Sequence, residues 1–215
     1  MRFPVDAILF DIDGTLVDST ASVVRTWKTW AATRGLDAEA ILRVCHGRRT
    51  EDTLVEFLPP DQHPAALVEL ARLERADMHD VLALPGTQSL LPRLPADRWA
   101  AVTSGSQDVM RARLIASGLP IPDVLVSAEA VAAGKPDPEG YLKAAAALGR
   151  DIRRCLVVED APAGIQAGRA AGARVLAVAT SHPAADLTSA DVVVPDLTAC
   201  EVEVTPDGLV VSTPA

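Results

Sequence analysis

The sequence predicts an α/β fold: a Rossmann-like parallel sheet core with helices on both faces and an inserted α-helical cap. Short apolar runs alternate with Ala-rich helical stretches over most of the chain, a pattern typical of parallel strands joined by crossover helices. Consecutive helical patterns between residues 16 and 82 interrupt that alternation. We therefore expect a core made of residues 1–15 and 83–215, and a helical cap made of residues 16–82 that folds separately over the core.

The strands of the core are expected at short apolar runs. The first run, VDAILF at residues 5–10, is broken only by Asp6 and is consistent with a buried strand. Further strands are expected at 98–104, 124–127, 154–160, 174–180 and 191–197, and helices at 106–117, 136–148 and 163–171. The final segment, residues 200–212, alternates around a Pro-Asp-Gly turn, which predicts a β-hairpin to which we assign no function.

The inserted segment is predicted to contain only helices. Breaks at Gly35, Gly47 and the Pro59–Pro60 pair separate its apolar patterns. The helices are expected at 20–34, 37–45, 49–58 and 62–81.

Composition narrows the classes of function. The chain has 215 residues, 49% of them hydrophobic, which is enough to bury a core and argues against global disorder. Its net charge of −9 leaves no basic footprint for nucleic acid or for an anionic membrane. The three cysteines are scattered, and neither a signal peptide nor a membrane span is indicated. We expect a cytoplasmic protein that is a monomer or a weak dimer.

Three carboxylates cluster in LFDIDGTLVDS, residues 9–19, where the first apolar run ends. Asp11 and Asp13 can converge on one point past the strand, because successive strand residues alternate between faces. Mg²⁺ prefers oxygen ligands and is usually bound by one or two carboxylates together with substrate phosphate. Gly14 and Thr15 then allow a tight turn with backbone N–H groups free to face an anion. A D-x-D pair alone is equally typical of an acidic turn before a helix.

Other polar residues follow later strands, at the edge where ligands of parallel sheets bind. In AVTSGS, Ser104 and the N–H of Gly105 can donate hydrogen bonds to a phosphate, although a helix N-cap is the alternative. Lys135 offers a compact cation, but a lone loop lysine is usually solvated. Glu159 and Asp160 add two carboxylates at the end of a further strand.

These four stretches, in this order, resemble the haloacid-dehalogenase-like hydrolase superfamily. Within it the chain looks like the β-phosphoglucomutase-type sugar phosphatases, on the motifs DIDGTLVDS and VVEDAPAGIQAG. The resemblance covers nearly the whole chain and implies an aspartyl-phosphate mechanism with Mg²⁺ as cofactor. It implies that Asp11 is the nucleophile and that Asp13 is the general acid and base. The phosphoryl group would be bound by Ser104 and Lys135. The implied metal ligands are Asp11, the Asp13 carbonyl and Asp160, with Glu159 bound to the metal or next to its ligands.

Two kinds of relative differ from this chain at single positions. The dehalogenases lack the second motif aspartate, whereas Asp13 is present here. The phosphoglucomutases carry a cap histidine twelve residues after the nucleophile, and position 23 is a valine. A phosphosugar mutase is therefore the weaker alternative. A non-catalytic module that binds a phosphometabolite is another, although such a module would be expected to lose Asp11 or Lys135.

The remaining interpretation is an Mg-dependent phosphomonoester hydrolase acting on a small sugar or polyol phosphate. The cap loop CHGRRTEDTL, residues 45–54, resembles the substrate loop of 2-deoxyglucose-6-phosphate and glycerol-phosphate phosphatases. Arg49 and Arg48 are candidates for contacting the substrate, and Thr50 or Glu51 for bonding polyol hydroxyls. A helix start with Thr50 as N-cap is an equally weighted alternative for each of these residues.

Overall fold

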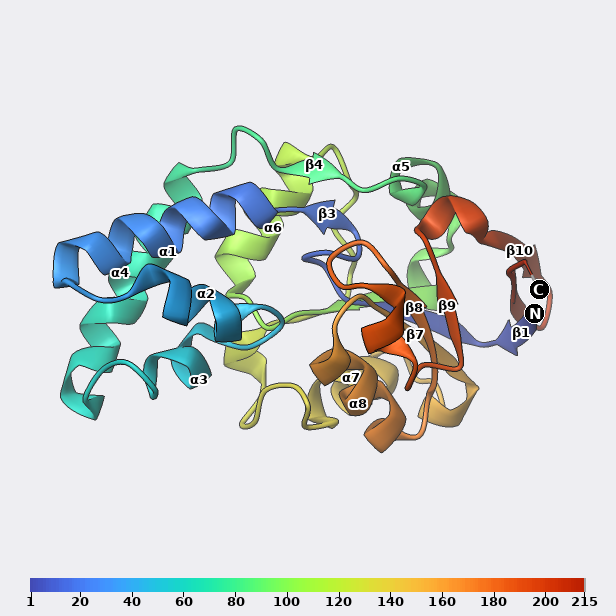
Figure 1. Ribbon diagram of the computed structural model, residues 1–215. Helices are drawn as coiled ribbons and strands as arrows, with labels where there is room; N and C mark the ends of the chain where they lie inside the picture. Colours follow the sequence, from blue (N-terminus) through green and yellow to red (C-terminus); the bar gives the residue numbers. More distant parts are fainter. Residues whose placement is uncertain (215) are drawn as a thin grey trace.

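The computed structural model describes residues 1–214 and is built around a six-stranded parallel sheet (Figure 1). The strand order is β6–β5–β2–β7–β8–β9. The predicted parallel α/β sheet is confirmed, with strands somewhat shorter than expected. In chain order these strands are β2 (Ala7–Phe10), β5 (Trp99–Val102), β6 (Leu125–Val126), β7 (Cys155–Glu159), β8 (Arg174–Val178) and β9 (Val192–Val194).

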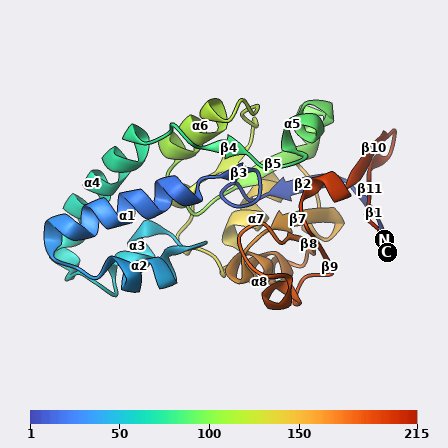
Figure 2. The ribbon, with the colours of Figure 1, turned by 45° about the horizontal axis from the view of Figure 1, so that its top comes forward.

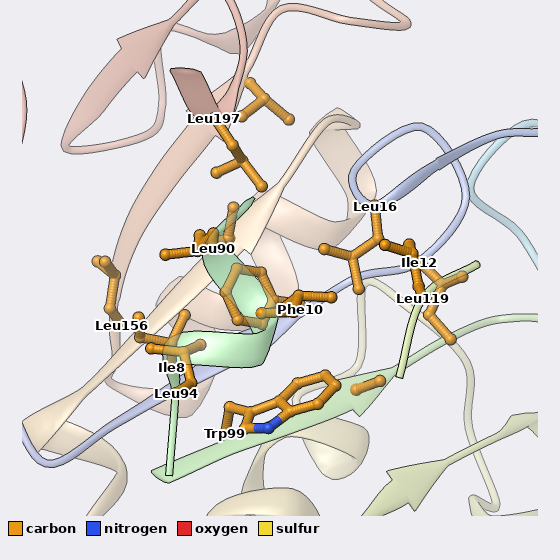
Figure 3. Packing of buried hydrophobic residues seen from close by; sticks show 14 of the residues in the cluster. Ile8, Phe10, Ile12, Leu16, Leu90, Leu94, Trp99, Leu119, Leu156 and Leu197 are labelled. Carbon is orange, nitrogen blue, oxygen red and sulfur yellow. The ribbon is translucent and has the colours of Figure 1, made fainter. Parts of the chain in front are cut away.

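Helices cover both faces of this sheet because strand side chains alternate between two buried clusters. On one face Ile8, Phe10 and Trp99 pack with Leu90 of α5 (Thr87–Leu90) (Figure 3). Residues of α6 (Gln107–Ala116) belong to the same cluster. The Phe10 and Trp99 rings meet edge to face, with centroids 6.2 Å apart. On the other face Leu9 and Val157 pack with residues of α7 (Glu139–Ala147) and α8 (Pro162–Ala171).

Strand β2 lies in the middle of the sheet, between β5 and β7. The chain leaves β2 toward one side of the sheet and later returns to its other side. In such sheets ligands bind beyond the carboxyl ends of the strands, where the strand order reverses. Asp11 directly follows β2, and its N–H donates to the Val158 carbonyl of β7 at 2.9 Å. The first aspartate is therefore fixed at this crevice by the sheet itself.

The strand predicted at residues 5–10 forms β2 from Ala7 to Phe10, whereas Val5 is the last residue of another strand in a different sheet. β1 (Arg2–Val5) pairs with β11 (Gly208–Ser212), and β11 pairs with β10 (Glu201–Thr205), all antiparallel. The break falls at Asp6, whose N–H donates to the Arg154 carbonyl at 2.7 Å and whose carboxylate accepts from the Arg154 side chain. The predicted C-terminal hairpin is confirmed, and it joins both ends of the chain at one end of the molecule (Figure 1).

The segment after the first strand forms a group of helices at the opposite end of the molecule from the chain termini (Figures 1 and 2). Their apolar faces meet in a cluster separate from the two sheet clusters, with Trp27 and Trp30 edge to face at 5.6 Å. The third and fourth helices are shorter than predicted, since α3 ends at Leu54 and α4 at Ala76. These inserted helices are α1 (Thr20–Arg34), α2 (Ala38–Cys45), α3 (Thr50–Leu54) and α4 (His63–Ala76).

A two-stranded ribbon, which the sequence did not predict, connects the inserted helices to the sheet. β3 (Val17–Asp18) pairs antiparallel with β4 (Leu82–Ala83). Strands of two residues are too short to display an alternating pattern. The ribbon places the segment that enters the inserted helices beside the segment that leaves them. Short 3-10 helices complete the described chain at Pro60–Gln62, Leu91–Arg93, Ala96–Arg98, Ala128–Ala130, Ile152–Arg154, Ala184–Leu187 and Leu197–Ala199.

Candidate active site

A cavity of about 100 Å³ lies between the carboxyl edge of the sheet and the inserted helices. It brings together nearly all of the site residues predicted from the sequence. From the predicted set its lining contains Asp11, Asp13, Thr50, Ser104, Gly105, Lys135, Glu159 and Asp160. Val23 and Trp27 of α1 add apolar surface to the same cavity.

Lys135 joins the carboxylates that follow two neighbouring strands. Its Nζ donates to Asp11 Oδ1 at 2.5 Å, to Glu159 Oε1 at 2.6 Å and to the Val102 carbonyl at 3.1 Å. Burial by itself would lower the pKa of Lys135, but Asp11 and Glu159 outweigh it and raise that pKa. Burial raises the pKa of Asp11 well above its ordinary value, and Lys135 opposes this rise. Lys135 is thus a fixed cation, but its single charge does not fully offset the effect of burial on the pKa of Asp11.

Glu159 accepts hydrogen bonds from four donors, and its carboxylate occupies space that a side chain at Gly164 would fill. Oε1 also accepts from the buried Tyr141 hydroxyl at 2.6 Å, while Oε2 accepts from the N–H groups of Asp160 and Ala161 at 3.1 and 3.4 Å. A Cβ on Gly164 of α8 would overlap the Glu159 carboxylate. Glu159 therefore needs a glycine at position 164 in order to face Lys135.

We expect Gly164→Ala to reduce activity by at least about tenfold without unfolding the protein. Alanine favours helices over glycine by about 1 kcal/mol, but its methyl group would push Glu159 away from Lys135, and charge-assisted hydrogen bonds are each worth about 1.5–3 kcal/mol. Phosphate release, the activity expected from the sequence, and thermal melting measure the two effects. Gly168→Ala is the matched control, because the nearest atoms to its Cβ would be those of Val157 and Val175; it should lower stability and keep the turnover rate. Full activity in Gly164→Ala would contradict the placement of Glu159.

Asp160 completes a group of oxygen donors that suits a hard divalent cation. The Asp160 carboxylate accepts from the hydroxyls of Thr15 and Ser181. Burial, reinforced by the Glu159 charge, raises the pKa of Asp160 to about 7. Asp11, Glu159 and Asp160 each offer a carboxylate oxygen, and these oxygens lie within 4.8 Å of one another. Buried carboxylates gathered at this spacing fit Mg²⁺, which prefers such ligands.

The loop after β2 turns back on itself at Gly14. Three N–H groups, those of Thr15, Leu16 and Val17, point to the Ile12 carbonyl, and Gly14 has a φ of +85°. A Cβ at Gly14 would also overlap the Asp160 carboxylate. This position consequently requires glycine both for its backbone conformation and for the close approach of Asp160.

The same loop presents Asp13 to the cavity, where both of its carboxylate oxygens are engaged. The Ser19 hydroxyl donates to Oδ1 at 2.7 Å, and Arg113 Nη1 donates to Oδ2 at 2.6 Å. Nη2 of Arg113 donates to Glu74 Oε1 at 3.2 Å. Burial raises the pKa of Glu74, and Arg113 opposes that rise.

Comparison with known proteins places this chain in one family. The family model described as a haloacid dehalogenase-like hydrolase matches residues 5–172. The chain belongs to the haloacid dehalogenase-like hydrolase family. Hexitol phosphatase A of Escherichia coli is 42% identical over 94% of this chain and 96% of its own length, and glycerol-1-phosphate phosphohydrolase 2 of Saccharomyces cerevisiae is 34% identical over 84% and 77%. A hydrolase structure from Pseudomonas syringae matches with a TM-score of 0.81 and 28% identity, over 89% of this chain and 94% of that one.

The predicted superfamily and the predicted phosphatase are therefore confirmed. In this haloacid dehalogenase-like hydrolase, three residues predicted to bind substrate line the cavity in addition to Lys135. Ser104 donates to the Gly47 carbonyl of the inserted segment at 2.9 Å, and the N–H of Gly105 donates to Thr103 Oγ1 at 3.1 Å. The third, Thr50, is the first residue of α3.

Arg49 does not join the other predicted residues in the cavity. Its guanidinium holds both oxygens of Asp52 at 2.9 Å and lies 3.4 Å from the carbonyls of Val131 and Ala132, on the wall of a neighbouring pocket. Arg49 precedes α3, and its contacts are those of a helix start that ties the inserted helices to a sheet loop. Arg48 lines the cavity in its place, beside His46. Burial lowers the pKa of His46.

Sequence reasoning missed Tyr141, Glu74 and Arg113. One signal was present for Arg113, because it lies on the same buried face of α6 as Val109 and Met110. A charged residue at helical spacing on an apolar face indicates a buried ionic contact.

Proposed function

We propose that this phosphatase hydrolyses the phosphomonoester of a small sugar or polyol through an aspartyl-phosphate on Asp11. The observation that carries the proposal is the ion pair between Asp11 and Lys135 in a covered cavity, next to Glu159 and Asp160. The names of relatives that act on hexitol and glycerol phosphates support the substrate class. We also propose the division into a core, residues 1–15 and 83–215, and a cap, residues 16–82.

The nucleophile in this proposal is the second carboxylate oxygen of Asp11. Lys135 takes Oδ1, and Oδ2 has no hydrogen-bond donor in the described part of the chain. Attack on phosphorus forms the Oδ2–P bond while the bond between phosphorus and the ester oxygen breaks. Lys135 offsets the negative charge of the phosphoryl group, which is the main requirement of phosphoryl transfer. Ser104 and the Gly105 N–H would join it by exchanging their bonds to the Gly47 carbonyl and to Thr103 Oγ1 for bonds to the phosphate.

Asp13 moves the proton in both halves of the proposed reaction. It donates a proton to the leaving alkoxide, and it later removes one from the water that attacks the aspartyl-phosphate. Its carboxylate lines the cavity two residues after the nucleophile. The proton that Asp13 gains in the hydrolysis step restores its acid form for the next turnover.

We propose that Mg²⁺ is held by the carboxylates of Asp11 and Asp160 and by the Asp13 carbonyl. When bound, Mg²⁺ supplies positive charge that offsets the repulsion between a carboxylate nucleophile and a phosphate dianion. Glu159, already bonded to Lys135, Tyr141 and two backbone N–H groups, would support these ligands by fixing Lys135.

The sugar or polyol part of the substrate would face the inserted helices. The cavity wall there combines the polar side chains of Thr20, His46 and Arg48 with the apolar Val23 and Trp27. Val23 offers no group for proton transfer at the position where the mutases carry histidine. This wall therefore supports hydrolysis over the mutase alternative, and the retained Asp11–Lys135 pair speaks against a module that only binds.

Three further predictions concern the state of the protein in the cell. Within residues 1–214, no helix is both long and apolar enough to cross a membrane. A cytoplasmic location, a monomer or weak dimer, and the absence of nucleic-acid partners stay predictions.

A panel of phosphate esters tests the proposed function. Hexitol, hexose, deoxyhexose and glycerol phosphates would be assayed for phosphate release with Mg²⁺ and again with EDTA. We expect turnover of one or more of these esters with Mg²⁺ and its loss after chelation. No release from any of them, or full release in EDTA, would refute the proposal.

Metal binding should depend on pH in a defined direction. The raised pKa of Asp160, about 7 without metal, lies above the unfolded value of about 3.9. The folded protein therefore binds a proton between these values, which favours the metal-free fold at pH 6 over pH 8 and competes with Mg²⁺. We expect Mg²⁺ to raise the melting temperature more at pH 8 than at pH 6. Asp160→Asn should remove this difference, and NaCl at equal ionic strength is the salt control. Equal shifts at both pH values in the wild type would contradict the assignment.

A further inference from the structure

A buried arginine bridges two carboxylates that come from opposite sides of the cavity. Arg113 lies on α6, which packs on the sheet, and its side chain is only 2% exposed. Its Nη1 donates a hydrogen bond to Asp13 Oδ2 at 2.6 Å, and its Nη2 donates one to Glu74 Oε1 at 3.2 Å. Glu74 lies in the last turns of α4, one of the inserted helices. All three side chains line the cavity.

The planar guanidinium transmits position from one carboxylate to the other. Its two terminal nitrogens point in fixed directions, so the orientation set by Glu74 also sets where Nη1 meets Asp13. With Oδ1 of Asp13 held by Ser19, the Arg113 contact leaves the carboxylate in one orientation. Nε of Arg113 is buried and has no hydrogen-bond partner within residues 1–214. Arg113 is thus anchored through Nη1 and Nη2 alone.

We propose that Arg113 is a positioning residue for Asp13, and that Glu74 makes this positioning depend on the docking of the inserted helices. The inference rests on the role proposed above for Asp13 in proton transfer. The Arg113–Glu74 contact joins α6 to α4, so it exists only while the inserted helices lie over the sheet. Asp13 is then fully oriented only when the cavity is covered, which ties proton transfer to an enclosed substrate.

Two mild substitutions test this coupling, each alone and combined with Asp13→Asn. Arg113→Lys keeps the charge but cannot reach two carboxylates in a fixed geometry, and Glu74→Gln removes one anchor of the arginine. With glycerol 1-phosphate we expect each to lower kcat by about 10-fold or more, with a smaller change in KM. With p-nitrophenyl phosphate, whose leaving group needs little protonation, the loss in single-turnover phosphoenzyme formation should be smaller. In the Asp13→Asn background neither change should lower kcat further by more than about twofold.

Matched controls lie on the same two helices. Arg111→Lys changes an exposed arginine of α6, and Glu69→Gln breaks another, more exposed ion pair of α4, the one with Arg34 at 2.9 Å. Both should keep wild-type kcat. Losses that multiply with that of Asp13→Asn, or equal losses on both substrates, would overturn the inference and indicate direct substrate contact or a structural role. If thermal melting shows that Arg113→Lys does not fold, Glu74→Gln decides by the same criteria. A wild type without phosphatase activity refutes the proposed function instead.

Discussion

Asp11→Asn should abolish turnover on every phosphate ester, by about 10⁴-fold or more, as is typical when a covalent nucleophile is removed. Asparagine has nearly the same shape as aspartate, but its amide is not a nucleophile toward phosphorus. The substitution also removes one of the carboxylates beside Lys135. Since burial already raises the pKa of Asp11, a neutral side chain should be tolerated there and the fold retained. Phosphate release and acid-quench trapping of a labelled phosphoenzyme measure the effect.

Asp18→Asn is the control for this experiment because it changes another carboxylate of the same motif. Asp18 is exposed, and its Oδ1 accepts from the Thr20 N–H at 3.0 Å, a contact that asparagine can keep. Wild-type turnover is expected. Activity retained in Asp11→Asn, or a labelled phosphoenzyme that still forms, would mean that the nucleophile lies elsewhere.

Much of the fold was predictable because its signals are local. Each of the six parallel strands is a short apolar run, and the helices between them are regular Ala-rich stretches. The failures come where tertiary contacts decide. The apolar run at residues 5–10 is divided at Asp6, whose contacts with Arg154 direct β1 and β2 into different sheets. The β3–β4 ribbon consists of two residue pairs and left no pattern to find.

The predicted site residues were found where topology alone brings them together. Asp11 and Asp160 follow β2 and β7, two adjacent parallel strands, so their meeting follows from the sheet order. Contacts between the inserted helices and the sheet follow no such rule. Arg113 and Glu74 lie 39 residues apart and meet only through the packing of α4 against α6. Arg48 and Arg49 are neighbours, and the start of α3 decides which of them lines the cavity.

Lys135→Met should lower turnover by about 10²–10³-fold, the usual cost of losing one preorganised charge in a reaction that develops negative charge. Methionine fills a similar volume without the ammonium group. It leaves Asp11 and Glu159 facing each other in a buried site, and breaking a buried ion pair costs about 3–5 kcal/mol of folding free energy. Phosphate release and thermal melting from pH 5 to pH 8 measure both effects. Lys143→Met, which removes an exposed lysine paired with Glu139, is the control and should change neither quantity appreciably.

The pH dependence of stability distinguishes this loss from a simple packing defect. In the wild type the raised pKa of Lys135 means that its contribution is present at every pH below its unfolded value of about 10.4, and none of it is lost between pH 5 and pH 8. Without Lys135 the pKa of Asp11 rises further above its unfolded value, since burial then acts unopposed. The folded variant binds a proton that the unfolded chain has released, so its stability should fall as the pH rises through this range, more steeply than that of the wild type.

Added Mg²⁺ should recover part of the melting temperature but not the rate, because a metal ion can offset the carboxylate charge without replacing the ammonium group beside Oδ1. Parallel pH curves for variant and wild type would show that Asp11 does not depend on Lys135, and the proposed nucleophile would lose its principal support.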